Sequence, residues 1–332
     1  MRLRARLTTT TAGLFVALAT VTSLSGCMTV RGETAVVPAT TEEEAQEVLD
    51  HYFEVSNEAW GAFDPELNAT VEGGALAEIN GASMVAQGAL AEEAEAAGEE
   101  PTVREPLSPV EPRFLIPQQS GWPKFFMVDT QLDVPDSEHN WLLTFARNSV
   151  DEPWKARYLS VLAPSAIPEF AEDGDGYLEE LQVSSENTGL SVVPGELGET
   201  YATYLQEGQG SFLGGPHTSE TLAVRDERAE DAASQTDYAD VPQEEADHPS
   251  FAVRTADGGA LVLFTMRMDE KQTWAEGETP VVDDRVKPLM QGTADRAVTL
   301  QRFATFTAYV PEGEDPVDLR SRLAGVFNAL GE

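Results

Sequence analysis

The stretch TEEEAQEVLDHYFEVSNEAWGAF, residues 41–63, determines the expected fold of the chain. Thr41, followed three residues later by Glu44, is typical of a capping box at the start of a helix. Apolar side chains then recur at three- and four-residue spacing, which predicts a helix with one buried face that ends at Gly61. The side chains of this face are Ala45, Val48, Leu49, Tyr52, Val55 and Ala59.

A second helix of the same character is expected over residues 194–205. A shift of 149 residues places Val48 on Leu197 and Tyr52 on Tyr201, and it also places residues 61–63 on residues 210–212. The same shift therefore aligns both the helix and the turn that follows it. This internal repeat predicts two units with the same order of elements.

Strand-like segments follow each helix, after a stretch rich in Ala and Glu. They cover residues 125–132, 141–147 and 154–163 in the first half and residues 251–255, 260–268 and 298–310 in the second. Asp257-Gly258-Gly259 is a hairpin signal between two of them. The expected fold class is α+β, with two tandem units in which an N-terminal amphipathic helix packs on a curved antiparallel sheet.

Three further segments have patterns of their own. Residues 92–112 are acidic and contain several prolines, which predicts a solvated loop, and residues 226–247 are expected to be mobile at their centre. Asp315-Pro316 is typical of a helix start. A terminal helix is expected there, with a buried face formed by Leu319, Leu323, Val326, Phe327 and Leu330.

The N-terminal segment has the layout of an export signal, with Arg2, Arg4 and Arg6 before an apolar run at residues 12–21. Its end, Leu24-Ser25-Gly26-Cys27, resembles the bacterial lipobox. That resemblance implies a diacylglyceryl group on the Cys27 thiol and cleavage just before it. The expected organisation is a signal peptide at 1–26, a tether at 27–40, a first domain at 41–180 and a second at 181–332.

Composition excludes several classes of function. The net charge of −37 would become about −40 on removal of residues 1–26, which carry three arginines and no acidic residue. Nucleic acid binding is not expected, because it requires basic residues that displace counterions from phosphates. Attachment to a membrane should depend on the lipid at Cys27 and not on a basic patch. Since Cys27 is the only cysteine, no disulfide, zinc thiolate site or cysteine nucleophile is expected.

Two resemblances go further than these patterns. The runs at residues 112–117 and 121–126, together with Pro153-Trp154-Lys155 and the lipobox, resemble a family of uncharacterised actinobacterial lipoproteins with a domain of unknown function. This resemblance implies no reaction, substrate or site residue. The order of helix then sheet is similar to the cone-shaped fold of nuclear transport factor 2, and a cystatin-like arrangement fits nearly as well.

Motifs for catalysis are missing from the sequence, so no catalytic residue, cofactor or metal site is predicted. There is no GxSxG, HExxH or phosphate-binding loop in the mature chain. Asp173-Gly174-Asp175-Gly176 predicts a turn and not a calcium loop, because the key carboxylates at both ends of such a loop are missing. The histidines are scattered, and His51 should lie off the buried helix face. They are His51, His139, His217 and His248.

Arginines cluster in the late strands and in the terminal helix that the sequence predicts. They are Arg267, Arg285, Arg296, Arg302, Arg320 and Arg322. In so acidic a chain they are expected to neutralise neighbouring carboxylates, and the alternative is that two of them hold a small anion.

The expected function is that of an extracytoplasmic lipoprotein, anchored to the cell membrane, that binds an envelope protein or a small apolar ligand. The first alternative is an envelope enzyme with an acid/base site inside one unit, for which Tyr52, Tyr201 and Tyr204 are the first candidates. A purely structural role, in which the acidic domains solvate a protein interface, is the third possibility.

Overall fold

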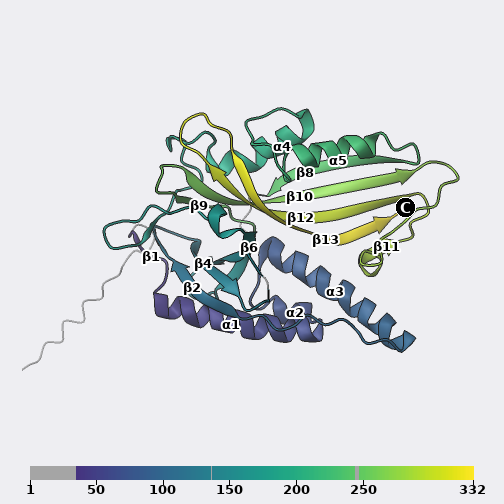
Figure 1. Ribbon diagram of the computed structural model, residues 1–332, viewed down its shortest axis with the longest axis horizontal. Coiled ribbons are helices and arrows are strands. Elements are labelled where there is room, and N and C mark those ends of the chain that lie inside the picture. Colours follow the sequence, from purple (N-terminus) through teal and green to yellow (C-terminus); the bar gives the residue numbers. More distant parts are fainter. Residues whose placement is uncertain (1–34, 136, 244–246) are drawn as a thin grey trace, which may run out of the picture. The chain divides into compact units, whose positions relative to one another are not determined.

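The computed structural model describes residues 35–135, 137–243 and 247–332 (Figure 1). Cys27 and the predicted signal peptide lie outside the described residues. The described residues all belong to one compact unit. The helices are α1 (Glu42–Ala62), α2 (Pro65–Asn68), α3 (Gly74–Ala97), α4 (Leu197–Glu207) and α5 (Ser219–Ala229), with 3-10 turns at Pro164–Ala166, Pro194–Glu196 and Lys287–Leu289.

The strands form three sheets. A small sheet has the order β1 (Val37–Pro38), β3 (Pro117–Gln119) and β7 (Leu178–Glu179). A four-stranded antiparallel sheet has the order β2 (Pro109–Leu115), β4 (Lys124–Leu132), β5 (Asn140–Arg147) and β6 (Lys155–Leu162). The six-stranded sheet has the order β11 (Met290–Gly292), β13 (Asp318–Gly331), β12 (Ala297–Val310), β10 (Ala260–Trp274) and β8 (Ser234–Gln243), and β9 (Phe251–Arg254) also pairs with β10.

Helix α1 begins where the capping signal predicts. The Thr41 side chain accepts a hydrogen bond of 3.1 Å from the Glu44 backbone N–H. The Glu44 carboxylate does not complete the box, because it accepts hydrogen bonds from Thr40 (2.6 Å) and from the Trp154 indole (2.9 Å). The helix ends at Ala62, one residue beyond the predicted Gly61, and Phe63 caps it in the left-handed region with a φ of 50°.

Each of the two larger sheets carries a helix on one face. Helix α1 covers the four-stranded sheet, where Tyr52 meets Phe145 edge to face at 5.5 Å. Helix α4 covers the six-stranded sheet, where Tyr201 contacts Phe306 at 5.1 Å. The opposite face of the four-stranded sheet packs against β9 and β10, as the 4.4 Å contact of Phe125 with Phe251 shows.

The fold class α+β is confirmed, since helices pack on mostly antiparallel sheets. All six predicted strands are present, and β10 is longer than predicted. The hairpin signal at residues 257–259 joins β9 to β10. The predicted second helix is also present, as a 3-10 turn at Pro194–Glu196 that leads into α4.

The predicted terminal helix is wrong, because this segment is strand β13, which pairs antiparallel with β12. Its apolar side chains pack against different parts of the protein and do not form one helix face. Leu319 packs in the cluster under α4, Leu323 packs against the cluster under α1, and Phe327 stacks on Phe303 at 4.6 Å. The pairing with β12 and these separate contacts outweigh the helical spacing in the sequence.

The predicted loop at residues 92–112 is confirmed for residues 98–108, which lie in no helix or strand, and is wrong for the residues on either side. Helix α3 continues to Ala97, and the chain that follows it is fixed by Leu107, which exchanges hydrogen bonds of 2.8 and 2.9 Å with the Asn57 side chain. In the second acidic stretch, α5 continues to Ala229 and β8 begins at Ser234. Helix ends and strands therefore occupy about half of residues 92–112 and most of the described residues of 226–247.

Candidate functional site

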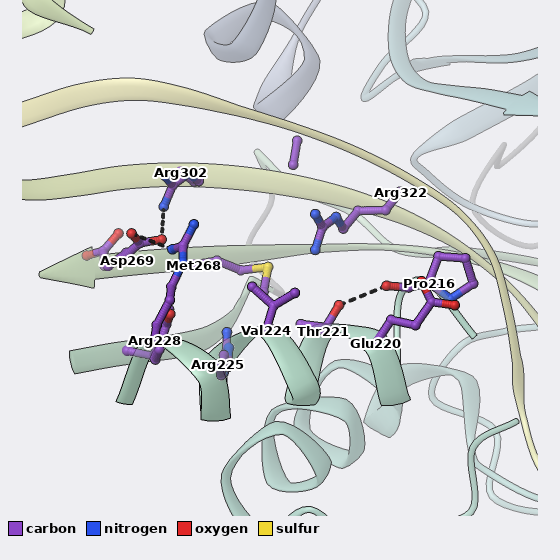
Figure 2. A pocket seen from close by; sticks show the side chains of 13 residues that line it. Pro216, Glu220, Thr221, Val224, Arg225, Arg228, Met268, Asp269, Arg302 and Arg322 are labelled. Carbon is purple, nitrogen blue, oxygen red and sulfur yellow. Dashed lines mark hydrogen bonds and ion pairs between the residues drawn. The ribbon is translucent and has the colours of Figure 1, made fainter. Parts of the chain in front are cut away.

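A cavity of about 370 Å³ lies between α5 and the six-stranded sheet, and four arginines line it. Figure 2 shows Arg225 and Arg228 extending from α5, and Arg302 and Arg322 from the strands that face it. The apolar part of the lining includes Val224 and Met268. Three carboxylates, Glu220, Asp269 and Glu270, also line the cavity, so arginines outnumber acidic residues there, in contrast to the chain as a whole with its net charge of −37.

Local structure explains why these side chains meet. Arg225 and Arg228 are three residues apart on α5, a spacing that puts two side chains on one helix face. Met268 lies directly opposite Arg302 in the register of β10 with β12, so both point to the same side of the sheet. We call the cavity formed by these residues together with Arg322 the arginine pocket.

Arg225 forms a double hydrogen bond with Asp240 of β8, at 2.6 and 2.8 Å. The Asp240 side chain is only 2% exposed, so this ion pair is buried. Burial by itself would lower the pKa of Arg225, but the hydrogen bonds and charge of Asp240 raise that pKa above its ordinary value. The guanidinium also stacks on the Tyr238 ring, 4.2 Å from its centroid. Arg225 is therefore a structural cation of the pocket wall.

Two further arginines share one carboxylate. Arg228 donates to Glu270 at 2.7 Å, and Arg302 donates to the other oxygen of Glu270 at 2.9 Å. The neighbouring Asp269 is engaged by Arg267 at 2.8 Å. Since one carboxylate faces two guanidinium groups, this triad retains one uncompensated positive charge.

Arg322 differs from the other three. Within residues 35–135, 137–243 and 247–332, no carboxylate lies within ion-pair distance of Arg322. Its charge is nevertheless close to α4 and the turn after it, since burial lowers the pKa of His217 and Arg322 lowers it further. Burial raises the pKa of Tyr201, and Arg322 opposes that effect. Arg322 thus presents to the cavity a guanidinium group that forms no ion pair among the described residues.

The geometry of a guanidinium group matches carboxylate and phosphate, to which it donates paired hydrogen bonds. The arginine pocket can therefore hold an anion. Its size is within the usual range of small-molecule sites, which is about 300–1,000 Å³.

The structure brings together two of the six arginines singled out in the sequence, Arg302 and Arg322. The prediction of neutralised carboxylates is confirmed for Arg267, Arg302 and Arg320. Arg285 lines a neighbouring groove, and Arg296 lies beside Trp274. Sequence reasoning missed Arg225 and Arg228, whose three-residue spacing within an acidic stretch was the available signal.

Tyr52, the first of the proposed acid/base tyrosines, does meet a carboxylate. Its hydroxyl donates to Glu72 at 3.1 Å, and Glu72 also accepts from Asn68 (2.6 Å) and Asn80 (3.0 Å). Burial raises the pKa of Glu72 to about 7. However, Glu72 is only 1% exposed, and it does not line the cavity of about 310 Å³ beside Tyr52. The network joins α1, α2 and α3 and offers no access for a substrate.

Tyr201 and Tyr204 are part of the aromatic core under α4. Tyr201 contacts Phe212, Phe264 and Phe306, and its hydroxyl donates to the backbone carbonyl of His217. Tyr204 stacks on Tyr201 at 6.1 Å. The sheet face under α4 is therefore filled by aromatic rings, an arrangement that does not favour an acid/base site there.

The other candidate residues do not converge. His51 is exposed at the rim of α1, as predicted, and His139 is exposed on a loop. His248 packs on the Phe303 ring at 5.0 Å. Asp173 forms the predicted turn, accepting hydrogen bonds from the backbone N–H groups of Asp175 (2.8 Å) and Tyr177 (3.1 Å). In the part of the chain that the structure describes, no group of three or more His, Cys, Asp or Glu side chains could hold a metal ion.

Comparisons with known proteins give the chain relatives but no activity. The family described as "Domain of unknown function (DUF8094)" matches residues 36–331. The chain is 37% identical over 322 residues to the uncharacterised lipoprotein SCO2278 of Streptomyces coelicolor, an alignment that covers 96% of this chain and 95% of the relative. It is 36% identical over 312 residues to an uncharacterised lipoprotein of Streptomyces avermitilis, with 93% of this chain and 91% of the relative covered.

No solved structure matches the chain. None of the helices in the described residues is long and apolar enough to cross a membrane. The extent of the family match and the identity to both relatives leave no doubt about the assignment. The chain belongs to the DUF8094 family, and the relatives it matches in Streptomyces are named as uncharacterised lipoproteins.

Proposed function

We propose that this protein is an extracytoplasmic lipoprotein that binds an anionic ligand in the arginine pocket, without catalysing a reaction. The observation that carries the proposal is Arg322, which lines the pocket and has no carboxylate partner among the described residues. Unpaired guanidinium groups in a cavity are a recognition device for carboxylate or phosphate. Arginine remains protonated in proteins, so these groups suit binding better than proton transfer.

The anchor is the second part of the proposal. The names of the Streptomyces relatives support a lipoprotein, and Cys27 is the only cysteine to which the lipid could be attached. A diacylglyceryl group supplies two chains, which is what stable membrane attachment requires. We expect the native chain in the membrane fraction of cells and a Cys27→Ala variant in the soluble fraction. If the variant stays equally membrane-bound, the anchor assignment is wrong.

We also propose that the two halves are tandem units of related design, resembling nuclear transport factor 2 or cystatins. The packing of α1 and α4, each on one face of an antiparallel sheet, supports this idea. The units would differ in elaboration, since α1 has 21 residues and α4 has 11. An experimental structure of residues 181–332 alone, folded as in the whole chain, would test whether the second unit is independent.

Anion binding is tested by calorimetry with inorganic phosphate and with acetate. We expect the Arg322→Ala variant to lose about tenfold or more in affinity, because a hydrogen bond to a charged group contributes roughly 1.5–3 kcal/mol. Arg113→Ala is the matched control, since Arg113 is an exposed arginine on β2, outside the pocket, that pairs with Asp129. Equal affinity of both variants and the native protein would show that the pocket is not the anion site.

A further inference from the structure

A second and larger cavity borders strands β12 and β13. It has a volume of about 800 Å³ and is bounded by α3, by the 3-10 turn at Lys287–Leu289 and by the ends of β12 and β13. We call this cavity the α3 groove. Its lining is mixed. The apolar side chains include Leu90, Leu289, Leu300 and Val326, and the charged ones are Glu99, Glu100, Asp283, Arg285 and Arg302.

The wall that α3 contributes is made of small and apolar side chains at four-residue spacing. They are Ala82, Ala86, Leu90 and Ala94. This spacing puts them on one face of the helix. None of the hydrophobic clusters found among the described residues includes them, whereas Met84 on another face of α3 packs against Ala59 and Trp60. Ala82 and Ala86 are nevertheless buried, so the apolar surface that this face of α3 leaves to the groove comes from Leu90 and Ala94, which are partly exposed.

The α3 groove and the arginine pocket have one lining residue in common, Arg302. Leu300 precedes Arg302 by two residues on β12, so strand alternation places both side chains on one face. Val326 of β13 lies directly opposite Arg302 in the register of the two strands. Leu300, Arg302 and Val326 thus share one face of the sheet.

We infer that the ligand is an anionic amphiphile, whose carboxylate or phosphate head group is held by Arg302 and Arg322 and whose linear, acyl-type tail lies in the α3 groove. This inference rests on the proposed anion site and adds the class of ligand. The linings favour it, because Arg302 and Arg322 can pair with an anionic head group, and the α3 groove offers the apolar side chains of Leu90, Leu300 and Val326 to the tail. A free inorganic anion would leave the apolar surface of the groove exposed to water, which is unfavourable.

The test compares three probes by calorimetry on the full chain with Cys27→Ala, a change that removes the lipid attachment point. The probes are inorganic phosphate, dodecyl phosphate and dodecanol, each below its aggregation concentration. Burial of each methylene contributes roughly fourfold in affinity, so even partial burial of the tail should make dodecyl phosphate bind at least about a hundredfold more tightly than phosphate. Dodecanol should bind more weakly than dodecyl phosphate. Dodecanoate, as a fourth probe, distinguishes a carboxylate from a phosphate head group.

Variants of α3 test whether the tail of the ligand lies in the α3 groove. Ala91→Trp places a large side chain in the groove, and Val85→Trp places the same side chain on an exposed face of α3, since Val85 is 42% exposed and does not line the groove. We expect Ala91→Trp to weaken dodecyl phosphate at least about tenfold and to leave inorganic phosphate unchanged, while Val85→Trp changes neither. Ala94→Trp is the second groove variant, used if Ala91→Trp does not show the native thermal unfolding transition.

The outcomes separate the two proposals. The amphiphile proposal would be overturned if phosphate and dodecyl phosphate bound equally, or if the groove variants did not change the affinity for dodecyl phosphate. Either result would leave the proposed anion site intact. Loss of phosphate and dodecyl phosphate binding in Arg322→Ala, with the tail effect present in the native chain, supports both. If no anion binds the native chain, the anion site itself is wrong.

Discussion

The Tyr52 hydroxyl lies 3.1 Å from a carboxylate oxygen of Glu72, and both side chains are almost completely buried, at 3% and 1% exposure. Asn68 and Asn80 donate to the same carboxylate from α2 and α3. These hydrogen bonds stabilise the charged form of Glu72, but desolvation is the larger effect and raises its pKa to about 7. A single carboxylate thus couples the packing of three helices to pH.

We expect the free energy of unfolding to decrease as the pH rises from about 4.5 to about 7, because Glu72 loses its proton over this range. The folded protein binds the Glu72 proton more tightly than the unfolded chain, so the stabilisation is fully present below the ordinary glutamate pKa and is lost as the pH rises through about 7. The shift corresponds to roughly 3 kcal/mol, since one pKa unit equals about 1.4 kcal/mol. Denaturation with urea at pH 4.5, 6 and 8 measures this contribution.

Glu72→Gln mimics the protonated carboxyl and should flatten this part of the pH profile. The variant should be more stable than the native protein at pH 8, and the difference should shrink toward pH 4.5. Glu66→Gln is the matched control, because Glu66 lies nearby on α2 and is exposed. If Glu72→Gln and Glu66→Gln changed the pH dependence of stability equally, the assignment of this effect to Glu72 would be contradicted.

The arginines of the pocket should separate into structural and binding residues. Arg225→Ala leaves the buried Asp240 carboxylate without its partner, which typically costs about 3–5 kcal/mol. Arg322→Ala removes no ion pair, so its effect on the free energy of unfolding should be within about 0.5 kcal/mol. Thermal and urea denaturation of the two variants measures the contrast. A large destabilisation by Arg322→Ala would mean that its guanidinium supports the fold and is not reserved for a ligand.

Local patterns were sufficient where the signal and the contact lie close together in the chain. Thr41 predicts the start of α1 because its partner is only three residues away. Six strands of the two larger sheets were predictable because each carries its own alternation or apolar run; they are β4, β5, β6, β9, β10 and β12. The buried faces of α1 and α4, marked by Tyr52 and Tyr201, were predictable for the same reason.

Features that depend on distant partners were not predictable. Strand β13 has the spacing of a helix, and only its pairing with β12 determines its conformation. Glu72 carries no sequence signal of burial, because its surroundings come from three helices. The arginine pocket depends on which of many carboxylates each arginine meets, and Asp240 and Glu270 lie 15 and 42 residues from Arg225 and Arg228 respectively.

Gly325 of β13 offered one local hint against a helix, since glycine costs about 1 kcal/mol relative to alanine in a helix interior. In the structure it has a packing role, because a Cβ at this position would lie 2.7 Å from Cγ2 of Ile79 on α3. Ile79 is buried and β-branched, so it has little freedom to move aside. The absence of a side chain at Gly325 is therefore what allows α3 to approach β13.

We expect Gly325→Ala to destabilise the protein by about 1–3 kcal/mol, the usual cost of overpacking. Gly61→Ala is the contrasting control, because a Cβ there meets nothing within 4 Å and the residue lies in α1, where alanine is favoured by roughly 0.5–1 kcal/mol. Ile79→Ala should relieve the clash, so the double variant should be more stable than the sum of the two single changes predicts. Urea denaturation of the four variants completes the cycle. If the changes in the free energy of unfolding were additive, Ile79 and Gly325 would not be in contact. Helix α3, which forms one wall of the α3 groove, would then not pack on β13 as described.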